Sequence, residues 1–128
     1  MVRVGGSIVP HEPVKRVLFV DDDEDVAGLL AAFYQSTGCD VRVATSGSAA
    51  IAVALDWRAD VVVLDLRLGD RDGCDVARRI LASSAPRIVA LTGSDDDDDG
   101  ARALAAGCCD LLVKPPRLDV LTRLIADA

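Results

Sequence analysis

The sequence predicts one α/β domain in which a parallel sheet of five strands is covered by helices on both faces. Five short apolar runs alternate with five segments of helical periodicity, at intervals of about 20 to 26 residues, as is typical of repeated strand–helix units. The middle apolar runs are continuous, as expected for parallel strands buried on both faces, and right-handed crossovers place helices on each side. Of the 128 residues, 51% are apolar but only 3% are aromatic, so the core must consist of Ala, Val, Leu and Ile.

The strands and helices follow one another in strict order along the chain. The predicted strands are residues 16–20, 41–44, 61–65, 87–91 and 111–113. Each helix is recognised from apolar residues three and four positions apart. The residues with this spacing, helix by helix, are Val26, Leu29, Leu30 and Phe33; Ala50, Val53 and Ala54; Val76, Ala77, Ile80 and Leu81; residues 101–107; and Leu118, Leu121, Leu124 and Ile125. Gly38 and Pro86 are stop signals after the first and third helices, and the second ends near Trp57.

Residues 1–15 precede this repeated pattern. They contain two glycines and two prolines, show no periodicity and are interpreted as a flexible N-terminal lead-in. The only histidine, His11, lies there without a partner in the surrounding sequence, so a ligand role for it is not expected. Residues 16–128 then form the single folded domain, since a chain of this length is too short for two.

Net charge and composition exclude several classes of function. The formal net charge of −7 argues against a nucleic-acid-binding surface and equally against binding to an anionic membrane. No apolar run approaches the length of a membrane span, and the N-terminus lacks the apolar stretch of a secretory signal. The cysteines Cys39, Cys74, Cys108 and Cys109 include no pair at CxxC spacing, so we interpret them as small buried apolar residues in a reducing cytoplasm.

Ionisable or hydroxyl-bearing residues follow the predicted strands at the end where ligands bind in such sheets. The residues delivered there, strand by strand, are Asp21 and Asp22; Thr45 and Ser46; Asp65; Thr92 and Gly93; and Lys114 and Pro115. A single Asp at a strand end is most often a turn residue. Turns are a poor explanation for the whole set, and we infer a polar site at this edge of the sheet.

The acids among these residues fit a divalent cation. Residues 21–25 are consecutive carboxylates, whose mutual repulsion is unfavourable unless a cation lies among them. Oxygen ligands suit Mg²⁺, which is typically held by one or two carboxylates together with a phosphate. If Asp22 and Asp65 bind the ion, a free oxygen of Asp65 can attack a phosphorus atom and form an aspartyl phosphate. Lys114 and the Thr92 hydroxyl would then neutralise charge on the transferring group.

At these positions the chain resembles the receiver domain of two-component response regulators, over roughly residues 16–126. The resemblance rests on the segments VLFVDDDED, VVVLDLRLGDRDG, VALTG and AAGCCDLLVKPP, and on their order and spacing. The matching positions are Asp21 and Asp22, the acidic pair; Asp65, the phosphoacceptor; Asp72 and Gly73; Thr92 and Gly93; and Lys114 and Pro115. The resemblance implies a cis peptide bond between Lys114 and Pro115. The resemblance also implies the flavodoxin-like strand order 2-1-3-4-5.

The resemblance further implies the metal ligands and the partners. Mg²⁺, or another divalent cation such as Mn²⁺, would be bound by Asp22, Asp65 and the backbone carbonyl of Arg67, and by Asp21 through water. The phosphoryl group would come from a phosphohistidine on a sensor histidine kinase or a histidine phosphotransfer protein. The domain would be a signalling phosphoacceptor and not an enzyme, although it assists its own phosphorylation and dephosphorylation. A downstream protein target or a fused output domain would recognise the face of the fourth helix, fifth strand and fifth helix.

Four features depart from the family pattern. Gly69 stands where many receivers have Pro, which leaves the loop after the phosphoacceptor freer. Leu111 replaces an aromatic residue that often turns inward on activation, so the coupling between site and surface must differ or be weaker. The side chain of Arg67 is expected over the site, where it would alter the lifetime of the phosphoryl group. The run SDDDDDG at 94–100 is interpreted as a solvated loop before the fourth helix, with recognition of a basic partner as the alternative.

Two other functions share parts of the pattern. Haloacid-dehalogenase-like phosphatases also have an apolar strand ending in Asp-x-Asp, here Asp21 and Asp23, and Asp21 would then be the nucleophile toward a small phosphoester. Against this, Asp65 and the Asp-Gly pair would be unused, and no acidic pair follows Lys114. A pseudo-receiver, with the fold but without phosphorylation, is the second alternative, although all the core acids are present.

Overall fold

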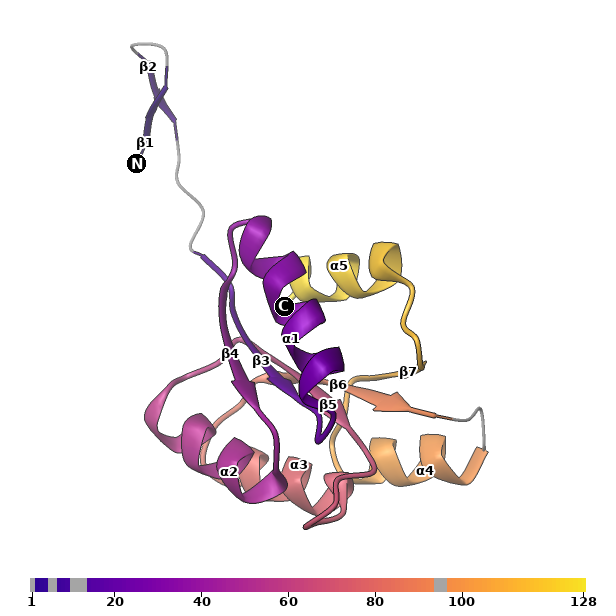
Figure 1. The fold of residues 1–128 in the computed structure, drawn as a ribbon. Helices are drawn as coiled ribbons and strands as arrows, with labels where there is room; N and C mark the ends of the chain where they lie inside the picture. Colours follow the sequence, from indigo (N-terminus) through magenta and orange to yellow (C-terminus); the bar gives the residue numbers. More distant parts are fainter. Residues whose placement is uncertain (1, 5–6, 10–13, 94–96) are drawn as a thin grey trace.

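A central sheet of five parallel strands organises the fold, and helices lie on both of its faces (Figure 1). The computed structural model describes residues 2–4, 7–9, 14–93 and 97–128. In chain order, the described elements are β1 (Val2–Val4), β2 (Ser7–Val9), β3 (Arg16–Val20), α1 (Glu24–Ser36), β4 (Asp40–Ala44), α2 (Gly47–Asp56), β5 (Val61–Asp65), α3 (Gly73–Leu81), β6 (Arg87–Thr92), α4 (Asp97–Ala105), β7 (Asp110–Val113) and α5 (Leu118–Ala126).

The strand order confirms the predicted fold class. Neighbouring strands run β4-β3-β5-β6-β7, which is the order 2-1-3-4-5 when the strands of this sheet are numbered along the chain. β3 pairs in parallel with both β4 and β5, so Val20 lies opposite Ala44 and Leu64. Asp65 lies opposite Leu91 of β6 in the same way. The carboxyl ends of the strands therefore meet at one edge of the sheet.

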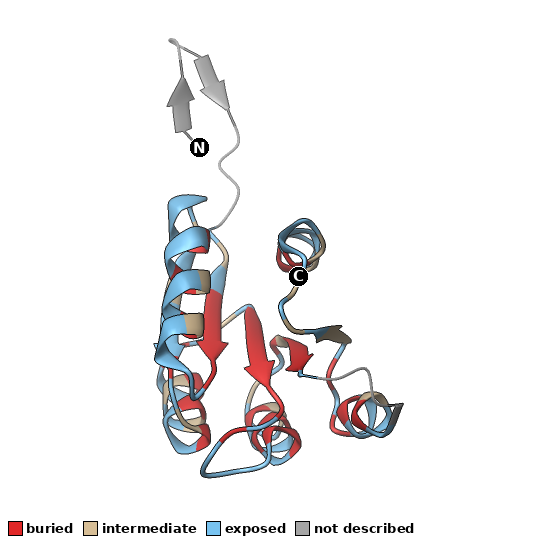
Figure 2. Cartoon of the chain, turned by 45° about the vertical axis from the view of Figure 1, so that its right-hand side comes forward, coloured by how far each residue is buried: buried red, intermediate tan, exposed pale blue. Residues whose placement is uncertain are grey.

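Apolar side chains fill the space between the sheet and the helices on each face. α1 and α5 lie on one side of the sheet, and α2, α3 and α4 lie on the other (Figure 1). Because strand residues alternate between faces, Leu18 and Val20 belong to the core under α2, α3 and α4, while Val17 and Phe19 belong to the core under α1 and α5. Every residue of β5 is buried, as its continuous apolar sequence predicts, and the buried central strands stand out in Figure 2.

The buried side of α1 differs from the apolar pattern that marks this helix in the sequence. Ala27, Ala31 and Tyr34 are buried, whereas Leu29 is 74% exposed and Phe33 is 40% exposed. The small alanines let the helix lie close to the sheet, and the ring of Tyr34 stacks on a phenylalanine of β3 with centroids 5.7 Å apart. The pattern thus predicts the helix correctly, but part of it forms an exposed apolar stripe.

The N-terminal segment contains two short strands that the sequence does not indicate. β1 and β2 pair antiparallel, with Val2 opposite Val9, inside the segment interpreted as a lead-in. His11 lies outside the described residues. Within the described ranges, none of the helices combines the length and the apolar character needed to cross a membrane.

The cysteines are all free, and two of them behave as predicted. Cys74 and Cys108 are buried, and burial raises the pKa of the Cys108 thiol to about 12. Cys39 is half-buried. The prediction is wrong for Cys109, which is exposed because it faces away from the core in the bend between α4 and β7.

Gly73 explains the Asp-Gly pair at the start of α3. Asp72 caps the helix, and its carboxylate accepts a hydrogen bond from the N–H of Cys74 at 2.8 Å. The N–H of Gly73 donates to the carbonyl of Leu66 at 2.9 Å. A Cβ at Gly73 would lie 2.6 Å from the carbonyl oxygen of Asp65 and 2.6 Å from the Cα of Leu66. Only glycine lets α3 begin directly against the end of β5.

Replacing Gly73 by alanine is expected to destabilise the fold, because the new methyl group would overlap main-chain atoms that cannot move aside. We expect Gly73→Ala to lower the free energy of unfolding by more than about 2 kcal/mol in urea denaturation. The matched control is Gly28→Ala, since a Cβ at Gly28 in α1 meets no atom within 4 Å. Alanine there should raise the free energy of unfolding by about 0.5–1 kcal/mol. Equal effects of the two substitutions would contradict the steric argument.

Candidate functional site

Three carboxylates from two strands converge at the carboxyl edge of the sheet. Asp21 and Asp22 follow β3, and Asp65 is the last residue of β5. Each offers an oxygen atom, and these atoms all lie within 4.8 Å of one another. Asp21 and Asp65 are buried, whereas Asp22 is exposed at the rim. The parallel register of β3 with β5 thus brings Asp65 next to two acids that lie far from it in the sequence.

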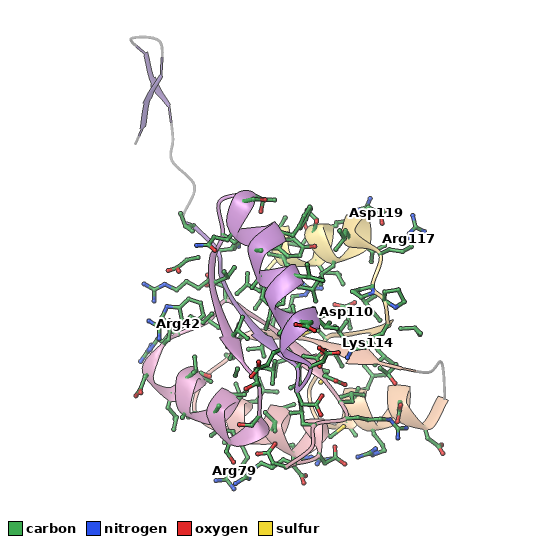
Figure 3. All side chains as sticks on the ribbon, in the orientation of Figure 1. Arg42, Arg79, Asp110, Lys114, Arg117 and Asp119 are labelled. Carbon is green, nitrogen blue, oxygen red and sulfur yellow. The ribbon has the colours of Figure 1, made fainter. Side chains whose placement is uncertain are left out.

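Lys114 contacts two of these acids at once. It follows β7, and its Nζ donates to Asp21 Oδ2 at 2.7 Å and to Asp65 Oδ2 at 2.9 Å. Its backbone N–H donates to the carbonyl of Thr92 at 2.7 Å. Figure 3 shows Lys114 near the first turn of α1, which begins just after the acids of β3. The expected cis peptide bond between Lys114 and Pro115 is confirmed.

Burial and ion pairing together govern the charges at this site. Burial is the largest effect on Asp65 and raises its pKa, while hydrogen bonds from the N–H of Arg67, 3.0 Å from Oδ1, and from Lys114 oppose the rise without cancelling it. Burial acts against the charge of Lys114, but hydrogen bonds to Asp21 and Asp65 outweigh it, and the pKa of Lys114 is raised. The ion pairs therefore favour the charged form of Lys114, whereas burial makes the ionised form of Asp65 less favourable than it is in water.

The acid cluster fits a small divalent cation in both charge and spacing. Lys114 offsets one of the three negative charges of Asp21, Asp22 and Asp65, so two negative charges remain. Mg²⁺ holds oxygen ligands at about 2.1 Å, which places the ligand atoms of one ion about 3–4 Å apart. The carboxylate oxygens here lie close to that spacing, and Asp22 is exposed at the rim, where its side chain has room to adjust. These three acids could hold the ion. That the backbone carbonyl of Arg67 is a further ligand stays a prediction.

The Thr92 hydroxyl is hydrogen-bonded to Asp99, a residue predicted to lie in a solvated loop. Thr92 is fully buried at the end of β6, and its Oγ1 donates to Asp99 Oδ2 at 2.7 Å. Asp99 belongs to α4 and is only 5% exposed, so that interpretation is wrong for it; residues 94–96 lie outside the described residues. The spacing of residues in the helix could have predicted this burial. Asp99 lies four residues before Ala103 and seven before Ala106, both buried, and so falls on the same side of α4.

The side chain of Arg67 extends toward α4. It is 73% exposed, and its Nη2 lies 3.7 Å from Asp99 Oδ2. Arg102 approaches the other oxygen of Asp99, with Nη1 3.9 Å from Oδ1, and also pairs with Asp72. Burial acts against the charge of Asp72, but hydrogen bonds from the N–H of Cys74 and from Arg102 outweigh it, and the pKa of Asp72 is lowered. The influence of Arg67 on a phosphoryl group stays a prediction.

The remaining acids of the run at 21–25 stabilise α1. Asp23 is the N-cap of the helix, and its Oδ1 accepts hydrogen bonds from the N–H groups of Asp25 at 3.0 Å and Val26 at 3.3 Å. Glu24 and Asp25 lie in the first turn, where negative side chains are favourable. The N–H of Asp23 donates to Asp21 Oδ1 at 2.9 Å. The run therefore divides between the site and the helix that follows it.

A family model described as the response regulator receiver domain matches residues 17–126. The DNA-binding response regulator MtrA of Mycolicibacterium smegmatis is 38% identical over 101 residues, which are 79% of this chain and 44% of that protein. The chain thus spans less than half the length of the curated relatives of this kind.

Two solved structures resemble the chain over most of its length. A chain in the co-crystal structure of the Saccharomyces cerevisiae histidine phosphotransfer signalling protein Ypd1 and the receiver domain of Ssk1 is 29% identical, with a TM-score of 0.82 over 90% of this chain and 88% of that one. A response regulator protein from Burkholderia pseudomallei, with a phosphorylated aspartic acid, calcium ion and citrate, is 27% identical, with a TM-score of 0.82 over 87% of this chain and 66% of that one.

Removing the charge of Asp65 is expected to stabilise the protein when no divalent cation is present. When folding raises the pKa of a carboxyl group, the folded protein becomes less stable as the pH rises above the ordinary pKa of that group, here 3.8. At neutral pH the buried charge of Asp65 therefore lowers the free energy of unfolding, and an amide of the same size avoids this cost. Asp65→Asn should raise the melting temperature in EDTA by about 2–5 °C. Added Mg²⁺ should then raise the melting temperature of the wild type far more than that of the variant.

The control for this measurement is Asp22→Asn, which removes the same charge at the exposed rim. It should change the melting temperature in EDTA less than Asp65→Asn does, because solvent already screens that carboxylate. A lower melting temperature of Asp65→Asn in EDTA would show that the buried charge stabilises the fold and would overturn this view of the site.

Proposed function

The chain belongs to the family of response regulator receiver domains, the phosphoacceptor domains of two-component signalling, and from this we propose that Asp65 carries the phosphoryl group. The observation that carries the proposal is the contact of a single ammonium, that of Lys114, with both Asp21 and Asp65. We propose that the receiver domain occupies residues 16–128, with residues 1–15 as a lead-in. Asp22 and Asp65 are the proposed metal ligands, joined by the backbone carbonyl of Arg67 and by Asp21 through water.

In the proposed reaction, a carboxylate oxygen of Asp65 attacks the phosphorus atom of a phosphohistidine. An O–P bond forms, the P–N bond to the imidazole breaks, and the imidazole nitrogen leaves with the electron pair of that bond. Lys114, which donates to Asp65 Oδ2, is placed to offset negative charge on the transferring group. Bound Mg²⁺, or Mn²⁺ in its place, supplies further positive charge and orients phosphoryl oxygens.

Hydrolysis of the aspartyl phosphate would return the domain to its resting form. Water attacks phosphorus, the O–P bond to Asp65 breaks, and inorganic phosphate leaves. Because Lys114 lies against Asp65 and Asp21, it is placed to offset phosphoryl charge in both reactions, and the domain is proposed to assist both its phosphorylation and its dephosphorylation. It is nonetheless a signalling domain and not a classical enzyme.

An apolar groove beside the site is the proposed binding place of the phosphohistidine donor. The groove has a volume of about 570 Å³ and lies between α1 and the segment that follows β7. The residues that line it are Val26, Leu29, Leu30, Gly93, Lys114, Pro115, Pro116 and Leu118. Because the groove reaches the site at Lys114, a sensor histidine kinase or a histidine phosphotransfer protein that packs an apolar helix face into it would bring its imidazole toward Asp65.

The output of the domain is proposed to pass through the face of α4, β7 and α5. Leu104 of α4 and Val113 of β7 are 69% and 44% exposed on these elements, and a downstream protein target or a fused output domain could cover them. The net charge of −7 supports the proposal that this domain itself binds neither nucleic acid nor a membrane. The four free cysteines suit the proposed location in the cytoplasm.

Neither alternative function is favoured. A dehalogenase-like phosphatase would use Asp21 and Asp23, but Asp23 caps α1, and Lys114 contacts Asp65, which that function leaves idle. A pseudo-receiver would have no need for a lysine in contact with two buried acids.

Labelling with a small phosphodonor tests the proposed phosphoacceptor. Acetyl phosphate with Mg²⁺ should add one phosphoryl group to the wild type, detected by intact-protein mass spectrometry, because acetyl phosphate needs no docking partner. Either EDTA or Asp65→Asn should abolish the addition. The control Asp25→Asn removes a carboxylate of the α1 first turn and should label normally. Persistent Mg²⁺-dependent labelling of Asp65→Asn would refute the proposal and would point to Asp21.

Transfer from a protein donor tests the proposed groove. Leu29→Lys places a charge in the apolar lining and should slow phosphoryl transfer from a phosphohistidine protein that labels the wild type, by about tenfold or more. Labelling by acetyl phosphate should stay unchanged, because Leu29 does not touch the acids. The matched control is Leu55→Lys on α2, which is 62% exposed and does not line the groove. If both variants accept phosphoryl groups from the protein at the wild-type rate, the donor binds elsewhere.

A further inference from the structure

We propose that Asp99 is a positioning residue that controls when the Thr92 hydroxyl becomes available to the phosphoryl group on Asp65. The inference rests on the proposed function, since it takes Asp65 as the phosphoacceptor. It assigns a role to a residue of the acidic run at 94–100, and it offers a route from the site to α4 that does not need an aromatic residue at Leu111.

Both oxygens of Asp99 lie near donor groups, from the site on one side and from α4 on the other. Oδ2 accepts the Thr92 hydroxyl at 2.7 Å and lies 3.7 Å from Nη2 of Arg67. Oδ1 lies 3.9 Å from Nη1 of Arg102, which also pairs with the α3 cap, Asp72. A buried carboxylate needs such partners, because charge removed from water is costly unless it is paired and hydrogen-bonded. Asp99 is thus held in place by groups from β6, from the loop after β5 and from its own helix.

A phosphoryl group on Asp65 competes with Asp99 for the Thr92 hydroxyl. The hydroxyl has a single hydrogen, and in this structure that hydrogen is committed to Asp99 in a short, charge-assisted bond. A phosphoryl group brings acceptor oxygens and close to two negative charges. It attracts the same hydrogen and the Arg67 guanidinium, and it repels the Asp99 carboxylate. Phosphorylation therefore weakens two contacts of Asp99 together.

Loss of these contacts would allow the first turn of α4 to move. Asp99 lies in that turn, and with Arg67 and Arg102 it lines a surface pocket of about 430 Å³, which gives the released carboxylate room to turn toward solvent. The next residue, Gly100, lies against β7, since a Cβ there would be 3.5 Å from Cδ2 of Leu111. A shift of this turn would therefore change the packing of Leu111. The route runs from Thr92 through Asp99 to the face of α4 and β7.

Kinetics of labelling by acetyl phosphate, at saturating Mg²⁺, test this role. Asp99→Ala frees the Thr92 hydroxyl and should accelerate labelling about fivefold or more, because a hydrogen bond to a charged group no longer has to be broken. Asp99→Asn keeps an acceptor without the charge and should give a smaller acceleration, about twofold. General damage to the structure would slow labelling. Faster labelling of Asp99→Ala, together with a melting temperature below that of the wild type, therefore identifies a positioning role. The matched control is Asp98→Ala, which removes an exposed charge next in the chain and should label at the wild-type rate.

A double substitution decides whether Asp99 acts through Thr92. In the Thr92→Val background, Asp99→Ala should produce no further acceleration, because the hydroxyl that Asp99 holds is gone. Wild-type or slower labelling of Asp99→Asn, equal acceleration by Asp98→Ala, or an undiminished effect in the Thr92→Val background would each overturn the inference. Asp65→Asn is measured in parallel: if it still labels, the proposed function fails, whereas a silent Asp65→Asn with unresponsive Asp99 variants removes only the role of Asp99.

Discussion

The ammonium of Lys114, held between Asp21 and Asp65, is the contact on which the other features of the site depend. Two buried carboxylates at one sheet edge repel each other, and burial alone already disfavours the ionised form of Asp65. Asp22 adds a third negative charge, and the single positive charge of Lys114 offsets only part of the total. The site therefore has an excess of negative charge, and a divalent cation is the simplest species that can neutralise it.

This contact exists because of the register of the sheet and the close approach of one helix. β3, β5 and β7 come from distant parts of the chain, and parallel pairing through β6 aligns their carboxyl ends. The loop after Asp65 must then turn back within a few residues. Gly73 allows this turn, since its missing side chain leaves space for the main chain of Asp65 and Leu66. The fold thus sets where the acids lie, and one glycine lets α3 begin directly against the end of β5.

The fold and the centre of the site were predictable because each depends on a repeated local pattern. Continuous Val and Leu runs predict buried parallel strands, and the residues that end those strands include Asp65 and Lys114. Asp99 was missed because a run of aspartates looks solvated, while its burial depends on which side of α4 faces β6. The exposure of Leu29 was missed for the same reason: periodicity marks a helix, but the partner across the interface decides which stripe is buried.

Aspartate performs three different tasks in this chain, and its neighbours decide among them. At Asp21 and Asp65 a shared lysine and burial produce a site that lacks positive charge. At Asp23 and Asp72 the first N–H groups of a helix make the same side chain a cap. At Asp99 a buried hydroxyl and two arginines hold it inside the protein, beside the loop that follows Asp65. The net charge of −7 therefore does not show which carboxylates form the site, because each carboxylate acts through the donors that the fold places around it.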